Sequence, residues 1–423
     1  MLLQDVLLLD SSMEKAQPCD LVLSGPVIDS ILPPRSSSLP AEFDGKGSVA
    51  VLPGFVNAHS HAAMTLLRGL GEEAPLMEWL QEKIWPVEAR LRPEHVYWGT
   101  MLALLEMLSG GITCFADMYF FMDQAAEAAR QSGMRCALCR GLVGSDEKKL
   151  EEGVALVRRF HEPLGMIHVQ LGPHAIYTVP PEAFREISMT ARDLGVGIHT
   201  HWLETEWEAG YIREELGKDP VDLLFEVGLS EVPHAILAHG VWFPEDRLEP
   251  LAGGNMAVAH NPNSNLKLGS GIAPVPSFLE KGIRVALGTD GAASNNRLDI
   301  WDEMRTCCLL HKGFRRNPCT VRAAEVLRMA TLDGARALGF EDVGLLKPGW
   351  QADLALVNLD KPHYVGATPE NLCASLVYSG SSADVEGTLA GGKWLFRKGR
   401  YETLDERAII HQARICRKEL LEG

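Results

Sequence analysis

The central part of this 423-residue chain alternates short apolar segments with stretches of helical pattern, and this alternation limits the folds open to it. Strand-like apolar segments lie near Val56 and Ile112 and at Arg135–Leu142, Ile167–Leu171, Gly197–His201, Ile236–His239, Met256–His260 and Val285–Gly288. Helical patterns fall between most of them, at Tyr97–Leu108, Asp123–Gln131, Pro181–Leu194 and Val275–Lys281. Eight strands that alternate with helices are typical of a parallel barrel. We therefore predict an α/β protein with a TIM-like (β/α)8 barrel.

Both ends of the chain differ from the centre, because they contain short β-rich segments broken by turns. These segments are Val6–Leu9, Leu21–Leu23, Val49–Leu52, Asp353–Leu359 and Trp394–Phe396. We expect residues 1–52 and 345–423 to form one small composite β-sandwich domain, and residues 53–344 to form the barrel. Within these limits, residues 404–423 are predicted to be a charged closing helix. Residues 322–340 are predicted to be a helix that packs on the barrel.

Composition excludes several classes of partner and compartment. The chain has 40 Lys and Arg against 56 Asp and Glu, a net charge of −16, which argues against nucleic acid and anionic membranes as partners. The nine cysteines are scattered and do not suggest a disulfide framework in a chain of this size. The start, MLLQDVLLLD, has no basic residue before its apolar run, and no apolar run reaches eighteen residues. We expect a cytoplasmic protein. Barrels of this size often self-associate, but no surface pattern in the sequence predicts a homo-oligomer.

The strongest local motif is a pair of histidines, His59 and His61, directly after the first predicted barrel strand. Because they are two residues apart on an extended segment, both imidazoles project from the same face. Neutral imidazoles are common metal ligands, so this pair predicts half of a metal site. The alternative is two histidines that meet at a strand end by chance.

Three further polar clusters end later strands of the predicted barrel. His199 and His201 precede Glu204 at the end of the fifth strand, His239 ends the sixth, and Asp290 follows the eighth. In a barrel the carboxyl ends of all strands meet at one mouth, so these clusters are expected to form one site. His199 and His201 are both candidate ligands, and His201 is favoured because it lies nearer the mouth and three residues before Glu204.

The resulting ligand set predicts one divalent metal ion per subunit. Its members are His59, His61, His201 and Asp290. Nitrogen-rich ligation with an open position favours Zn²⁺, with Fe²⁺ and Mn²⁺ as alternatives. The fourth strand ends in Gly172-Pro173-His174 and not in a lysine, which argues against two metals bridged by a modified lysine. The pair Cys136 and Cys139 has no second pair to complete a metal site and is read as core.

The order and spacing of these motifs resemble the amidohydrolase superfamily, in its branch of deaminases and chlorohydrolases. The similarity covers residues from about 50 to 310. Within that branch the chain is most similar to the deaminases of 5-methylthioadenosine and S-adenosylhomocysteine. The segments that carry this second similarity are Trp85–Glu88, Asp117–Phe120, Arg140–Leu142, Gly172–Tyr177, His260–Leu268, Gly271–Pro274 and Thr289–Asn296.

The resemblance implies hydrolytic deamination of the adenine moiety of a nucleoside, with release of ammonia. Glu204 would protonate the ring nitrogen, His239 would hydrogen-bond the attacking oxygen, and Asp290 would move the proton to the leaving amine. Glu204 and Asp290 would also contact the substrate. Further substrate contacts are implied for Glu88, at the ribose hydroxyls, and for Arg140 and His174. The ordinary alternatives are an ion pair between Glu88 and Arg140, and a loop histidine with its own hydrogen bonds.

One segment departs from the family pattern. Relatives place an arginine for the homocysteine carboxylate shortly after the segment of Arg140, whereas this chain has Lys148 and Lys149 in that region. A lysine is a point charge and cannot bind a carboxylate through two parallel hydrogen bonds. This difference puts a preference for S-adenosylhomocysteine in question. The alternative activities in the same branch are deamination of guanine, cytosine or a pterin, and dechlorination of a triazine. A second alternative is a metal-binding or scaffold protein without catalysis, against which intact Glu204, His239 and Asp290 argue.

Overall fold

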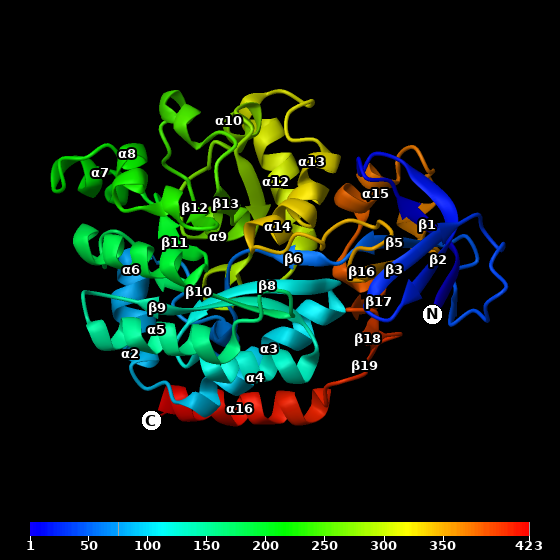
Figure 1. Ribbon diagram of the computed structural model, residues 1–423, viewed down its shortest axis with the longest axis horizontal. Coiled ribbons are helices and arrows are strands. Elements are labelled where there is room, and N and C mark those ends of the chain that lie inside the picture. Colours follow the sequence, from blue (N-terminus) through cyan, green and yellow to red (C-terminus); the bar gives the residue numbers. More distant parts are fainter. Residues whose placement is uncertain (75, 423) are drawn as a thin grey trace.

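The computed structural model describes residues 1–74 and 76–422 and has a barrel beside a sheet from the two chain ends (Figure 1). The eight predicted barrel strands form one parallel sheet in the order β14-β13-β12-β11-β10-β9-β8-β6. Their bounds are β6 Phe55–Asn57, β8 Ile112–Tyr119, β9 Arg135–Leu142, β10 Ile167–Pro173, β11 Ile198–Trp202, β12 Ala235–His239, β13 Met256–His260 and β14 Arg284–Leu287. The predicted (β/α)8 barrel is confirmed.

The first and last barrel strands meet next to the candidate site. The backbone N–H of Ala58 donates to the carbonyl of Leu287 over 2.8 Å, and that of Asp290 donates to the carbonyl of His59 over 2.9 Å. Two short strands, β7 (Ser60–His61) and β15 (Asp290–Gly291), continue this contact as a parallel pair. Closure of the barrel therefore places His61 and Asp290 side by side, although 229 positions of sequence separate them.

Strands from both ends of the chain form a second sheet, which lies on the right in Figure 1. Their bounds are β1 Leu2–Leu9, β2 Ala16–Ser24, β3 Val27–Leu32, β4 Phe43–Asp44, β5 Val49–Pro53, β16 Leu354–Asn358, β17 Val385–Ala390, β18 Lys393–Arg397 and β19 Arg400–Tyr401. The two halves join where β5 pairs antiparallel with β16, with Val51 opposite Leu356. The N- and C-terminal segments therefore share one sheet, where the sequence predicted a β-sandwich built from both ends.

A buried ion pair fastens this sheet to the barrel. Arg135, the first residue of β9, donates from Nε to Oδ2 of Asp353 over 2.8 Å, and its side chain is 3% exposed. Asp353 directly precedes β16, and its Oδ1 also accepts the backbone N–H of Gly391 over 2.8 Å. The pair thus links a barrel strand to two segments of the terminal sheet.

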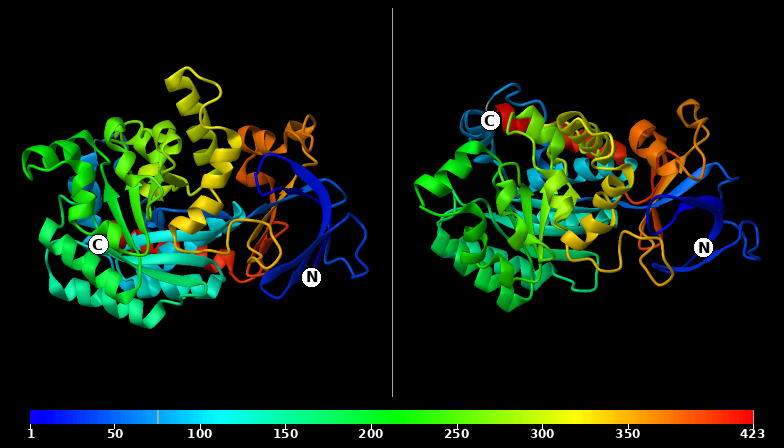
Figure 2. Two further views of the ribbon diagram at one scale, coloured as in Figure 1. Left: turned by 45° about the horizontal axis from the view of Figure 1, so that its top comes forward. Right: turned by 90° about the horizontal axis from the view of Figure 1, so that it is seen from above.

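Helices cover the outside of the barrel, as Figure 2 shows from two further directions. The α-helices are α1 Leu76–Glu78, α2 Trp85–Glu88, α3 Pro93–Ser109, α4 Met122–Ser132, α5 Glu147–Phe160, α6 Pro181–Leu194, α7 Glu206–Glu214, α8 Pro220–Glu226, α9 Pro262–Lys267, α10 Val275–Glu280, α11 Ala292–Asn295, α12 Ile300–Arg315, α13 Ala323–Met329, α14 Leu332–Ala337, α15 Leu372–Ser379 and α16 Glu406–Glu422. Short 3-10 helices are η1 Ala62–Leu67, η3 Leu229–Glu231, η4 Glu245–Arg247, η5 Glu249–Leu251, η6 Pro362–Tyr364 and η7 Ser382–Asp384, and η2 Trp79–Ile84 is a π-helix. Among the described residues, none of these helices is long and apolar enough to cross a membrane.

Two helical predictions differ from the structure in detail. Residues 322–340 form two helices, α13 and α14, because the backbone of Thr331 between them has φ −133° and ψ −93° and leaves the helical region. The terminal helix α16 exists as predicted, but it packs against α3 of the barrel and not on the terminal sheet (Figure 1). Its buried residues Ile409, Ala413, Cys416 and Leu420 follow a helical spacing, which explains how one face of it covers the barrel.

Candidate metal and active site

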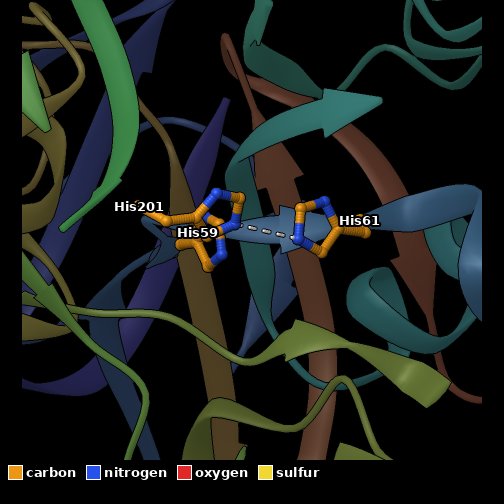
Figure 3. A group of neighbouring side chains, drawn as sticks. All are labelled: His59, His61 and His201. Atoms are coloured by element: carbon orange, nitrogen blue, oxygen red, sulfur yellow. Dashed lines mark hydrogen bonds between the residues drawn. The ribbon is translucent and has the colours of Figure 1, made fainter. Parts of the chain in front are cut away.

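The four side chains predicted as metal ligands meet at the carboxyl ends of the barrel strands. His59 follows β6, His61 lies in β7, His201 in β11 and Asp290 in β15. Figure 3 shows that the imidazoles of His59, His61 and His201 converge, and the Nε2 atoms of His61 and His201 are 3.4 Å apart. Oδ1 of Asp290 lies 3.4 Å from Nε2 of His59 and 3.3 Å from Nε2 of His61. The structure therefore brings all four predicted ligands together.

The hydrogen bonds behind these rings determine which nitrogen faces the centre. Nδ1 of His61 lies 2.6 Å from the carbonyl oxygen of Met118, and Nδ1 of His201 lies 2.8 Å from that of His174. Because a carbonyl oxygen only accepts, both Nδ1 atoms must carry the hydrogen. Although burial opposes it, Asp290 raises the pKa of His61 to about 9 and so favours a proton on its Nε2. A cation that took the place of this proton would receive the Nε2 lone pairs of both His61 and His201.

The charges around the cluster also fit a bound cation. Oδ2 of Asp290 accepts from the hydroxyls of Ser264 over 2.6 Å and Ser294 over 2.8 Å, which leaves Oδ1 directed at the histidines. Although burial opposes ionisation, the neighbouring His59 and His61 hold the pKa of Asp290 well below its usual range. Three imidazole nitrogens and one carboxylate match the ligand types of a zinc site with an open position. The residues present therefore fit a divalent metal ion.

His199 lies behind the cluster. Its Nε2 is 2.8 Å from Nδ1 of His59, its side chain is buried, and it is not part of the group formed by His59, His61 and His201. Burial holds the pKa of His199 well below its usual value, so the ring is neutral. The geometry favours His201 as the ligand at this strand. His199 instead holds the imidazole of His59 in its orientation.

Glu204 and His239 form a second pair beside the metal ligands. Oε2 of Glu204 lies 3.7 Å from Nε2 of His239, and Oε1 accepts from the hydroxyl of Ser270 over 3.2 Å. Burial raises the pKa of Glu204 above its ordinary value of 4.5. Nδ1 of His239 donates to Oδ1 of Asn265 over 2.8 Å, so that its Nε2 is the free acceptor. A carboxyl group whose pKa is raised by burial thus faces an imidazole acceptor.

Comparison with known proteins agrees with this arrangement. The sequence model of the amidohydrolase family matches residues 50–395. This chain belongs to the amidohydrolase family. It is 46% identical over 374 residues to the 5-methylthioadenosine/S-adenosylhomocysteine deaminase of Dictyoglomus thermophilum, covering 88% of this chain and 87% of the relative. It is 45% identical over 384 residues to the 5'-deoxyadenosine deaminase of Methanosarcina mazei, with coverages of 89% and 88%.

A solved structure extends the similarity to the whole amidohydrolase chain. The crystal structure of an adenosine deaminase from Xanthomonas campestris, with bound zinc, superposes with a TM-score of 0.92. That protein is 33% identical in sequence, and the match covers 99% of each chain. The barrel and the terminal sheet therefore form one common architecture in both proteins.

The amidohydrolase site opens into a cavity of about 920 Å³ that also contains the predicted substrate residues. Glu88, Arg140 and His174 line it together with His61, His201, Glu204, His239 and Asp290. Oε1 of Glu88 accepts from the hydroxyl of Tyr119 over 2.7 Å, and burial raises the pKa of Glu88. Nδ1 of His174 lies 3.0 Å from the hydroxyl of Thr178. Glu88 and Arg140 do not pair with each other among the described residues, since Nε of Arg140 bonds Glu152 over 2.9 Å.

The outer part of the cavity is largely apolar. Its walls include Leu76, Trp79, Leu80, Trp85, Leu91, Phe120, Phe121, Val143 and Leu156. Neither Lys148 nor Lys149 belongs to the described lining, and Nζ of Lys149 bonds the carbonyl of Val143 over 3.1 Å. The segment of Lys148 and Lys149 therefore brings no lysine to the cavity.

Sequence reasoning missed the residues that position this site. The buried carboxylate of Glu208 accepts the backbone N–H groups of Leu203 over 2.9 Å and Glu204 over 3.0 Å. Thr205 caps α7 and accepts the N–H of Glu208, so the Thr-x-x-Glu spacing was the available signal. Asn265, which orients His239, lies in the already noted segment His260–Leu268, but no spacing rule links it to a strand 26 residues earlier.

Proposed function

We propose that this amidohydrolase hydrolytically deaminates the adenine ring of 5'-methylthioadenosine and related adenosines, including S-adenosylhomocysteine, to the inosine analogues and ammonia. The observation that carries the proposal is the position of the buried Glu204, whose pKa is raised by burial, opposite His239 and beside the His/Asp cluster. The names of the similar deaminases support the same chemistry. A nucleoside carries no phosphate, which suits a chain with a net charge of −16.

We assign one divalent metal ion to His59, His61, His201 and Asp290, with Zn²⁺ as the favoured ion. When bound, such an ion supplies a water molecule whose pKa is lowered to about 7, so that hydroxide is available at neutral pH. The hydrogen bonds that the carbonyl oxygens of Met118 and His174 accept support this assignment, because they turn the Nε2 atoms of His61 and His201 to one point.

Glu204 acts as the acid toward the base. Its burial favours the neutral carboxyl, which donates its proton to ring nitrogen N1 and makes carbon 6 electrophilic. Ser270 holds Oε1, and the carboxylate of Glu208 holds the backbone of Glu204, so the proton is presented from a fixed position. Fixed donors cost little reorganisation at the moment of reaction.

Asp290 and His239 handle the attacking water. Oδ1 of Asp290 is free of the serine hydroxyls that hold Oδ2, and it takes a proton from the water. Nε2 of His239 accepts a hydrogen bond from the attacking oxygen, because Asn265 keeps the hydrogen of the ring on Nδ1. The oxygen bonds to carbon 6, Asp290 passes the proton to the amine, and the carbon–nitrogen bond breaks, so that ammonia leaves. The proton left on the new hydroxyl returns to Glu204, which gives the keto product and restores the acid.

The remaining cavity residues bind the nucleoside. Glu88 accepts hydrogen bonds from the ribose hydroxyls, while Arg140 and His174 line the space around the sugar. The apolar outer wall receives the 5' substituent. Because Nε of Arg140 is already hydrogen-bonded to Glu152, this guanidinium offers less positive charge to a carboxylate on that substituent, and the other arginine of the lining is Arg159. We therefore expect methylthioadenosine to be a better substrate than S-adenosylhomocysteine.

The test is a substrate panel with metal-loaded protein. Methylthioadenosine, S-adenosylhomocysteine, adenosine and 5'-deoxyadenosine are followed by the ultraviolet change from adenine to hypoxanthine, beside guanine, cytosine, a pterin and a chlorotriazine. We expect turnover of the nucleosides. No change with any of the four nucleosides would overturn the proposal, and turnover of only a free base or a triazine would replace it.

Two matched variants test the assigned acid. Glu204→Gln removes the proton donor and is expected to lower kcat by roughly 10²–10⁴-fold with the metal content unchanged. Glu206→Gln, on the exposed surface two residues later, is expected to leave kcat unchanged. Near-normal turnover of the Glu204→Gln protein would refute the role of Glu204.

A further inference from the structure

A second group of metal-ligand side chains lies inside the protein, apart from the first. It consists of His260, at the end of β13, and of Cys307 and His311, which are one turn apart on α12. One potential ligand atom from each of the three lies within 4.8 Å of the others. The group shares no residue with the candidate active site.

The polar atoms of this group have few partners. Nδ1 and Nε2 of His260 and Nε2 of His311 are buried and have no hydrogen-bond partner among the described residues. Each of the two side chains is only 1% exposed, and Cys307 is fully buried. Buried polar groups are normally hydrogen-bonded, and an unmatched one costs free energy. One lone-pair nitrogen of His260 and Nε2 of His311, unmatched beside one sulfur, therefore call for a ligand that accepts lone pairs.

The protonation states suit such a ligand. Burial holds the pKa of His260 well below its usual value and lowers that of His311 to about 4, so both rings are neutral and each offers a lone pair. The buried carboxylate of Glu303 lies one turn before Cys307 on α12, and its oxygens are held by Asn263 and Asn295. Burial raises the pKa of the Glu303 side chain to about 8, so it adds no full negative charge to this pocket at neutral pH.

We propose that His260, Cys307 and His311 form a second, structural metal site for a thiophilic cation of the Zn²⁺ type. Two imidazoles and one thiolate are ligands that such ions prefer. On binding, the S–H bond of Cys307 breaks, a sulfur–metal bond forms and the proton is released to solvent, while the two imidazoles contribute lone pairs. The ion would fasten α12 to β13, directly before α9, which carries the Asn265 that orients His239.

Co²⁺ is the probe for this site, because a thiolate bound to cobalt gives a charge-transfer band in the near ultraviolet. The candidate active site holds only histidines and a carboxylate and cannot produce that band. The titration uses the full chain in a Cys319→Ala background, since Cys319 is the exposed cysteine. We expect two bound ions per chain and a thiolate band. A single bound ion without the thiolate band would overturn the proposal of a second metal site, and it would leave the proposed metal at the candidate active site unaffected.

Variants locate the sulfur ligand. Cys307→Ala is expected to abolish the band and to halve the bound cobalt, and His311→Gln to weaken the second ion in the same way. Cys308→Ala is the matched control, because Cys308 is also buried on α12 but is not part of the group. It is expected to keep both ions. A band that survives in Cys307→Ala, or that is lost equally in Cys308→Ala, would refute the assignment.

Discussion

The ion pair between Arg135 and Asp353 allows a sharp test of how the terminal sheet is held to the barrel. Two contacts join the side chains, Nε to Oδ2 over 2.8 Å and Nη2 to Oδ1 over 3.3 Å. Their side chains are 3% and 1% exposed, so water does not screen them. We propose the single variants Arg135→Met and Asp353→Asn and the double variant. Each single change leaves one partner buried without its counter-charge.

The expected loss follows from this burial. Removing one member of a buried, hydrogen-bonded ion pair costs about 3–5 kcal/mol of unfolding free energy. With an unfolding entropy of about 2 cal/mol/K per residue, this corresponds to a Tm lowered by roughly 3–6 °C. The double variant is expected to lose less than the sum of the two singles, because it removes both charges. Differential scanning calorimetry of the wild type, the two single variants and the double variant measures both the Tm and the unfolding free energy.

An exposed ion pair supplies the control. Arg140 and Glu152 are 2.9 Å apart, but the side chain of Glu152 is 48% exposed. Glu152→Gln is therefore expected to cost only about 0–1 kcal/mol. If Asp353→Asn lowered Tm no more than Glu152→Gln, or if the two singles simply added in the double variant, the reasoning from burial and coupling would be refuted.

Three further predictions concern the site and the pH response. Glu152→Gln is expected to raise kcat/KM for S-adenosylhomocysteine relative to methylthioadenosine by roughly fivefold, the worth of an ion pair of about 1 kcal/mol, because it frees Arg140 for the substrate carboxylate. His61→Gln is expected to lower bound zinc in metal analysis, and chelation is expected to lower the Tm of the wild type more than that of this variant. Burial opposes ionisation of Asp20, but its four backbone N–H donors outweigh this and hold its pKa below 3.8. The ionised form of Asp20 therefore stabilises the fold at pH values above 3.8, and this stabilisation is lost as the pH falls through the lower pKa of the folded protein. Asp20→Asn is expected to flatten the acid side of a plot of Tm against pH.

Each of these predictions has a result that contradicts it. For substrate choice, Glu151→Gln is the control, since Glu151 is exposed next to Glu152 and does not bond Arg140. An equal change in the ratio of the two kcat/KM values in Glu151→Gln and Glu152→Gln would argue against the role of the ion pair between Arg140 and Glu152. Unchanged zinc in His61→Gln would remove His61 from the ligand set. An Asp20→Asn protein with the acid response of the wild type would show that other carboxylates dominate it.

The sequence by itself determined the barrel and most of the candidate site. Periodic apolar segments predicted all eight barrel strands, because strands buried on both faces read as continuous apolar runs. Placing His59, His61, His201, Glu204 and the later polar residues at strand ends then predicted one shared mouth, since parallel strands in a barrel end on the same side. Local pattern and topology were sufficient for this step.

Only the tertiary structure decided how the side chains are oriented and supported. The choice of His201 over His199 depended on which imidazole faces His61, and that orientation is fixed by the carbonyl of His174, which directly follows the neighbouring strand β10. The pairing of Arg140 with Glu152, in place of Glu88, likewise joins residues of two different elements. Such contacts between elements leave no periodic trace in one sequence.

The same limit applies to the second cluster and to the ends of the chain. His260 and His311 are separated by 51 positions, and nothing in the local pattern pairs them until α12 packs against β13. The sequence also did not reveal that α16 packs along α3. The pattern of an amphipathic helix shows which of its faces is buried, but it does not show which element covers that face. The sequence specifies its elements locally, whereas the partner of each buried face is decided by the packing of the whole chain.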